Sequence, residues 1–77
     1  RPSSVYDDGR YTYFVFREGI RQPAIFKADA RGLERTVNWT QHGNIVRVLG
    51  VNDLWTLRID DDALCVARDG AALSVGN

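Results

Sequence analysis

The sequence predicts an all-β fold, a small antiparallel β-sandwich of about seven or eight short strands. Turn signals recur roughly every 8–12 residues, which is the spacing of short strands in a sandwich or barrel. No segment keeps a helical spacing of apolar residues over three turns. One run, residues 11–16, is apolar on both faces of a strand and therefore needs cover on both sides. A partly open barrel is the alternative that these patterns leave open.

Four strands are expected in the first half of the chain. Asp8-Gly9 is a tight-turn signal that ends the first strand, and Glu18-Gly19 interrupts the chain after the second. Pro23 has no backbone N–H and is typical of a strand start or of a sheet edge. The expected strands are residues 5–6, 11–16, 24–28 and 34–40, the last two joined by a loop at 29–32.

Four further strands are expected in the second half. Arg47 and Gly50 interrupt a β-branched, apolar run, and Gly50 is typical of a β-bulge. Turns are marked by the three consecutive aspartates at residues 60–62 and by Asp69-Gly70. The expected strands are residues 45–51, 54–59, 64–68 and a weaker one at 71–75.

Residues 11–16 determine the expected layers. Successive side chains of a strand point to opposite faces; here one face carries Tyr11, Tyr13 and Val15, and the other Thr12, Phe14 and Phe16. Neither face is polar, so we expect a second sheet to cover one face and another protein to cover the other. The apolar core is expected to contain Phe14, Phe16, Phe26, Trp39, Trp55 and Leu57.

Length and composition narrow the function classes. The 77 residues are enough for one domain, residues 1–77, with one thin core. Ten Lys and Arg balance ten Asp and Glu along the chain, so the basic patch of a nucleic-acid binder is missing. No apolar run approaches the ~20 residues of a membrane-spanning helix. With one His and one Cys, we expect no enzyme activity, no bound metal and no cofactor.

Cys65 allows two interpretations. Strand alternation places it opposite Leu64 and Val66, where a free cysteine commonly acts as a small buried side chain. An unpaired cysteine in an exported protein also suits an intermolecular disulfide. The sequence leaves both open.

Residues 5–14, Val-Tyr-Asp-Asp-Gly-Arg-Tyr-Thr-Tyr-Phe, resemble the signature of one family. This family is the outer-membrane core-complex subunit of type IV secretion systems, of the TraO/TrbG/CagX type, in its C-terminal domain. The stretches at 23–26, 34–39, 54–59 and 64–66 are similar to later strands of that domain, in the same order. The resemblance covers residues 2–66, and the tail after Arg68 is not matched.

The resemblance implies a fold, a location and partners. It implies a β-sandwich in the periplasm of a Gram-negative bacterium, at the inner face of the outer membrane. It implies binding to a short lipoprotein subunit, packing against the channel-forming core subunit of the TraF/TrbI type, and a ring of many copies, with no catalysis. Because residue 1 is Arg rather than Met, we expect a C-terminal domain of a longer exported protein.

An extended partner segment can pair with an exposed sheet edge and place alternate side chains in pockets. Tyrosine suits such a site because it combines apolar area with a polar tip. The expected partner-binding residues are Val5, Tyr6, Tyr11, Tyr13, Val66 and Arg68, with Cys65 as the candidate for a disulfide to the partner. The tyrosines have a second interpretation, as side chains that only cap the core.

A glycan-binding β-sandwich is the alternative function. It would require Trp39 or Trp55 at the surface, where a ring can stack on a sugar. Strand alternation places both among apolar neighbours, so the binding of a protein partner is the favoured prediction.

Overall fold

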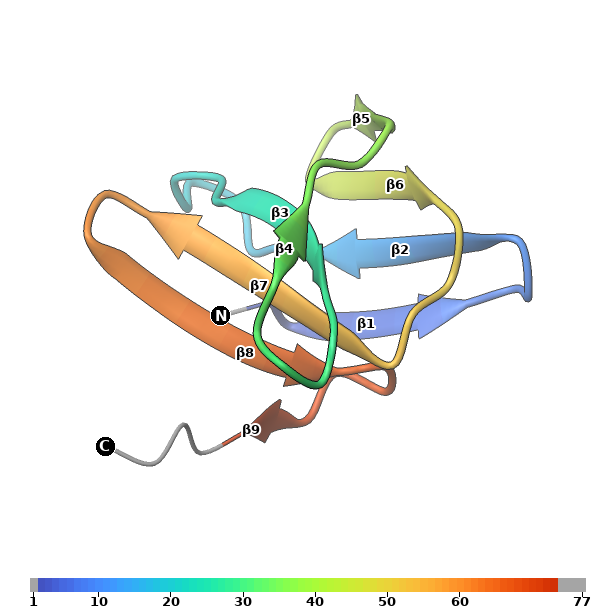
Figure 1. Cartoon of the computed structure of the whole chain (residues 1–77). Helices are drawn as coiled ribbons and strands as arrows, with labels where there is room; N and C mark the ends of the chain where they lie inside the picture. Colours follow the sequence, from blue (N-terminus) through green and yellow to red (C-terminus); the bar gives the residue numbers. More distant parts are fainter. Residues whose placement is uncertain (1, 74–77) are drawn as a thin grey trace.

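Nine strands arranged in two antiparallel sheets make up the part of the chain that the computed structural model describes, residues 2–73 (Figure 1). The first sheet has the order β1-β2-β6-β5. Its strands are β1 (Ser4–Asp7), β2 (Tyr11–Val15), β6 (Ile45–Leu49) and β5 (Trp39–His42).

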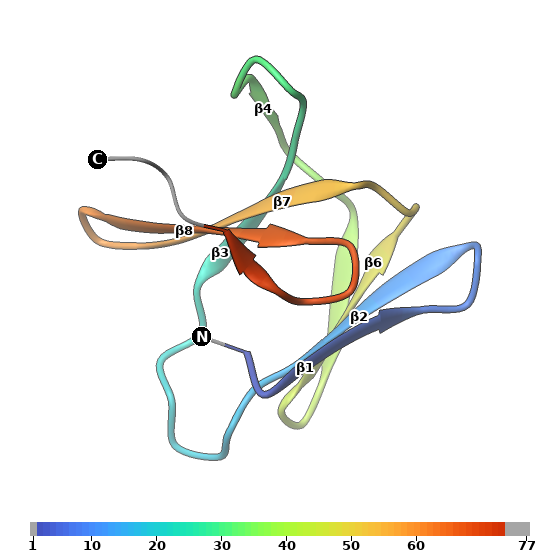
Figure 2. The ribbon, with the colours of Figure 1, turned by 90° about the horizontal axis from the view of Figure 1, so that it is seen from below.

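The second sheet has the order β4-β3-β7-β8-β9. Its strands are β4 (Glu34–Arg35), β3 (Ala24–Ala28), β7 (Leu54–Ile59), β8 (Asp62–Ala67) and β9 (Ala72–Leu73). Figure 2 shows the two sheets as separate layers. The predicted sandwich is therefore confirmed, and the partly open barrel is not what forms.

Hairpins within a sheet alternate with crossings between the sheets. β1 pairs with β2, β3 with β4, β5 with β6 and β7 with β8, all antiparallel. The links from β2 to β3, from β4 to β5 and from β6 to β7 each carry the chain to the other layer. Each hairpin is local, whereas the order of strands in each sheet depends on these crossings.

The inner faces of the two sheets form one apolar core. The first sheet and the residue after β2 contribute Val5, Phe14, Phe16, Val46 and Val48, and the second sheet contributes Ile25, Trp55, Leu57 and Val66. Phe14 meets Trp55 edge to face, with 5.2 Å between ring centroids and 84° between ring planes, a geometry that aromatic pairs prefer. Four of the six predicted core residues, Phe14, Phe16, Trp55 and Leu57, are confirmed.

The prediction of one strand over residues 34–40 is wrong. The chain forms β4, leaves the second sheet, and starts β5 in the first sheet at Trp39. Among the described strands, β5 has a neighbour on one side only, and Trp39 is 55% exposed instead of lying in the core. Val37, in the link between the two strands, packs against the core instead.

Phe26 is also outside the core. Its register partner on β7 is Thr56, whereas the neighbouring residue Ile25 pairs with the core residue Leu57. Alternation therefore directs Phe26 to the outer face of the second sheet, where it is half-buried.

Gly50 ends a strand rather than forming a bulge inside it. β6 stops at Leu49, and Gly50 has a φ of +106°, a conformation that side chains rarely adopt. Its N–H donates to the Arg10 carbonyl at 2.8 Å, and its carbonyl accepts from the buried Thr12 hydroxyl at 2.8 Å. These bonds hold the end of β6 beside the β1–β2 turn.

The last expected strand, 71–75, is seen in part as β9, which begins at Ala72, and residues 74 and 75 lie outside the described part. Over residues 2–73 no helix has the length and apolar character that crossing a membrane requires.

Candidate functional site

Three of the predicted site residues meet on the outer face of the first sheet. Thr12 and Phe14 of β2 point into the core, so Tyr11 and Tyr13 point outward. Tyr6 of β1 is opposite Tyr13 in the register, and the two rings stack with centroids 5.0 Å apart and planes at 16°. Tyr6 is 48% exposed. The result is an aromatic surface on which no other element of the described chain packs.

Two arginines approach the third tyrosine. The guanidinium carbon of Arg47, on β6, lies 4.5 Å from the centroid of the Tyr11 ring, and that of Arg10 lies 5.5 Å from it. Both distances are within the range of a cation–π interaction. Arg47 was not among the predicted site residues. Its signal in the sequence was a charge at the outward position of an otherwise apolar strand.

The β1–β2 turn holds these aromatic residues in place through Asp8. Its carboxylate accepts the N–H groups of Arg10 at 2.9 Å and Tyr11 at 2.7 Å, and the Tyr13 hydroxyl at 3.1 Å. The backbone donors, Tyr11 first, lower the pKa of Asp8. Desolvation, together with the bond to this carboxylate, raises the pKa of Tyr13. The turn is thus a local anchor for two outward tyrosines.

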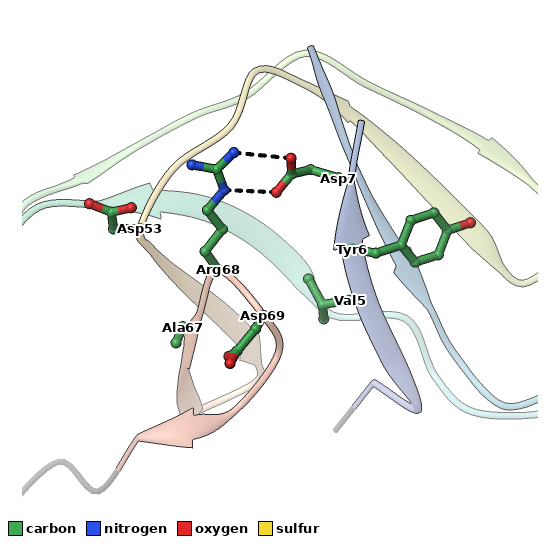
Figure 3. A pocket seen from close by; sticks show the side chains of 7 residues that line it. All are labelled: Val5, Tyr6, Asp7, Asp53, Ala67, Arg68 and Asp69. Carbon is green, nitrogen blue, oxygen red and sulfur yellow. Dashed lines mark hydrogen bonds and ion pairs between the residues drawn. The ribbon is translucent and has the colours of Figure 1, made fainter. Parts of the chain in front are cut away.

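A groove of about 580 Å³ runs between the β1 edge and the end of β8 (Figure 3). Its lining residues are Val5, Tyr6, Asp7, Asp53, Ala67, Arg68 and Asp69. The Arg68 guanidinium donates to both carboxylate oxygens of Asp7, at 2.8 Å from Nε and 3.1 Å from Nη2. The bond from Arg68 lowers the pKa of Asp7, and Asp7 in turn raises the pKa of Arg68. This bidentate pair connects β1, at the edge of the first sheet, with the end of β8 in the second.

The β8–β9 turn reaches back to β1 (Figure 2). Gly70 is so close to β1 that a Cβ built on it would lie 3.0 Å from the Cβ of Val5. The Asp8 N–H donates to the Tyr11 carbonyl at 3.1 Å. Because bonded and non-bonded pairs alternate along an antiparallel ladder, the backbone of Asp7 faces away from β2. The β1 edge therefore offers unpaired backbone next to the groove.

The remaining predicted site residues have different surroundings. The side chains of Val5 and Val66 belong to the core, with 7% and 0% exposure. Val5 lies on the edge strand β1, whereas Val66 lies on β8, which pairs with β7 on one side and β9 on the other. Arg68 lines the groove. Cys65 is a free, half-buried cysteine on β8, paired in register with Thr56 and Leu73 and facing away from the core. The described residues contain no group of three or more His, Cys, Asp or Glu that could hold a metal ion.

Comparison with known proteins gives one family and several relatives. The family CagX, described as conjugal transfer protein, matches residues 1–69. Protein virB9 of Agrobacterium fabrum is 34% identical over 65 residues, which are 84% of this chain and 22% of the relative. Type IV secretion system protein virB9 is 40% identical in Bartonella henselae and 38% in Bartonella quintana, again over 84% of this chain. The chain thus spans less than a quarter of the length of these curated relatives.

Proposed function

The chain belongs to the CagX family of conjugal transfer proteins, and from this premise we propose that it is a structural and interaction module of a type IV secretion system. Two of its relatives carry that system in their names. The proposed place is the outer-membrane core complex, in the periplasm at the inner face of the outer membrane. We place no catalytic step in this role. The chain would act as the C-terminal domain of a longer exported protein.

The proposed partner is a short lipoprotein subunit of the same system, bound along the β1 edge. The observation that supports this most directly is the open groove beside that edge, lined by Tyr6 and by the Asp7–Arg68 pair. An extended segment could pair with the free backbone of β1 and set alternate side chains on Tyr6 and in the groove. Tyr13, stacked on Tyr6, would extend the apolar contact.

Two further contacts complete the proposed role. We place the channel-forming core subunit and neighbouring copies of this chain, arranged in a ring, on surfaces that the lipoprotein leaves free. The family resemblance supports these partners. The balanced charge of the chain gives no reason to add nucleic acid to them.

The lipoprotein contact can be tested with a synthetic peptide from the mature N-terminal region of the cognate lipoprotein. We expect it to shift the amide resonances of β1 and of the β8–β9 turn. Tyr6→Ala should weaken binding by ~1–3 kcal/mol while the fold remains intact, since Tyr6 is a half-exposed aromatic anchor. Arg31→Ala, in the exposed β3–β4 loop, is the matched control and should bind normally. Shifts confined to other strands, or unchanged affinity in Tyr6→Ala, would contradict the proposed site.

The same complex tests the role proposed for Cys65. Cys65 faces outward on β8 and has no disulfide partner within the described residues. If it links to the lipoprotein, co-purification of the two proteins without reducing agent should give a covalent pair that reductant separates. Cys65→Ser should then leave only the non-covalent complex. If the two proteins separate without reductant, they are not linked by a disulfide, and the role of Cys65 is packing alone.

A glycan-binding role is the second candidate, and the exposure of Trp39 favours it. Trp55 is fully buried, so acrylamide should quench mainly the fluorescence of Trp39. A neutral oligosaccharide such as chitotetraose should protect Trp39 from the quencher if sugars stack on it. If the sugar does not change the quenching of Trp39 fluorescence, the glycan-binding role is excluded.

A further inference from the structure

The opposite edge of the first sheet is formed by β5 (Figure 1). All four of its residues are exposed, and it pairs only with β6. The Leu49 N–H donates to the Asn38 carbonyl at 2.9 Å, next to the register pair of Trp39 and Val48. Because bonded pairs alternate along the ladder, the backbone groups of Trp39 and Gln41 face away from β6. The edge can therefore accept another strand.

An apolar hollow of about 180 Å³ lies on the inner side of this edge, between the two sheets. Its lining includes Pro23, Ile25, Val37, Trp39 and Val46. An aliphatic side chain of an added strand, pointing to the same side as Trp39, would enter this hollow and lose its contact with water.

A second hollow, of about 200 Å³, lies on the outer side of the same edge. It is lined by Tyr11, Asn38, Trp39, Thr40, Arg47 and Leu49. Trp39 lines both hollows and is 55% exposed. Tyr11 and Arg47 are half-buried. Trp, Tyr and Arg are the residue types that most often dominate binding energy in protein interfaces.

The outer hollow carries positive charge without an internal counter-charge. Arg47 and Arg10 both approach Tyr11, whereas the ion pairs found within residues 2–73 use Arg21, Arg58 and Arg68. The Asp8 carboxylate, in the β1–β2 turn, already accepts two backbone N–H groups and a tyrosine hydroxyl. A carboxylate from outside would complete this site through charge-assisted hydrogen bonds.

We propose that the β5 edge binds an extended polypeptide segment of a partner protein in which acidic and aliphatic residues alternate. On a strand added to β5, alternate side chains would point to the two hollows. The aliphatic residues would fill the inner hollow, and the acidic residues would reach Arg47 across Thr40. The proposal does not depend on the role given to the β1 edge, because the two edges lie on opposite sides of the first sheet.

The experiment titrates the chain with a blocked hexapeptide of alternating glutamate and valine, and with the same peptide carrying lysine in place of glutamate. The glutamate peptide should bind, should shift the amide resonances of Trp39 and Gln41, and should bind more weakly as salt increases. Arg47→Gln should reduce its affinity about tenfold, the effect of one charged hydrogen-bonding partner. Arg31→Gln, outside the hollow, and Tyr6→Ala, at the other edge, should leave the affinity unchanged.

Several outcomes would overturn the proposal. One is that the glutamate peptide fails to bind, or that the lysine peptide binds equally well. Another is that Arg47→Gln binds the glutamate peptide with full affinity, or that the shifted amide resonances lie on β1 in place of β5. If the chain self-associates and Trp39→Ala abolishes that self-association, the β5 edge binds a second copy of the chain instead. If Trp39→Ala fails to fold, thermal unfolding will reveal it, and Arg47→Gln, which keeps the apolar core, remains the deciding variant.

Discussion

Replacing Trp55 with alanine is expected to remove about 3–5 kcal/mol from the free energy of unfolding. The side chain is fully buried and packs edge to face on Phe14 at the centre of the sandwich. A chain of this length has a total stability of roughly 4–12 kcal/mol, so the loss is a large fraction of the total and the urea midpoint of Trp55→Ala should fall sharply. Urea denaturation followed by circular dichroism measures the change.

Two variants sharpen this prediction. Trp39→Ala removes the same indole from the exposed β5 edge, and it should cost less than half as much. Trp55→Phe should also cost less than Trp55→Ala. Phenylalanine keeps most of the apolar volume, and the buried Trp55 N–H that it removes has no hydrogen-bond partner within the described residues. Equal losses in the two tryptophan-to-alanine variants would contradict the assignment of Trp55 to the core and Trp39 to the surface.

Gly70→Ala is expected to destabilise the fold by about 1–3 kcal/mol and to disturb the groove at the β1 edge. Gly70 has a φ of +92°, and an added Cβ would approach the Cβ of Val5 to 3.0 Å and its Cγ2 to 3.3 Å. Val5 is buried on β1 and cannot move aside without shifting that strand. The β8–β9 turn should therefore separate from β1, and the lipoprotein peptide should bind more weakly.

Gly32→Ala is the matched control. Its φ of +84° carries the same kind of backbone strain, but an added Cβ would meet no atom within 4 Å. The difference between the two variants isolates the contact with Val5. If Gly32→Ala costs as much as Gly70→Ala, backbone conformation alone explains both, and the turn does not press on β1.

Local patterns in the sequence were sufficient for the fold class and for most of the core. Side chains alternate on a strand whatever its neighbours are. The sequence was therefore enough to assign Phe14 and Trp55 to inward positions, and Tyr11 and Tyr13 to outward positions. The Asp8-Gly9 turn signal likewise depends on adjacent residues only, and the structure places a turn there.

The exposure of Trp39 was decided by tertiary structure. Whether an inward side chain is buried depends on whether another strand lies beside it, and the crossing between β4 and β5 places Trp39 on an edge. The groove has the same origin, since Asp7 and Arg68 are 61 residues apart and meet only where the two sheets stack. Sequence by itself thus determined the alternation along each strand, which is set by the local backbone. Long-range strand pairing determined which strands form the edges of each sheet and where the grooves lie. Residue spacing within one strand does not encode that pairing.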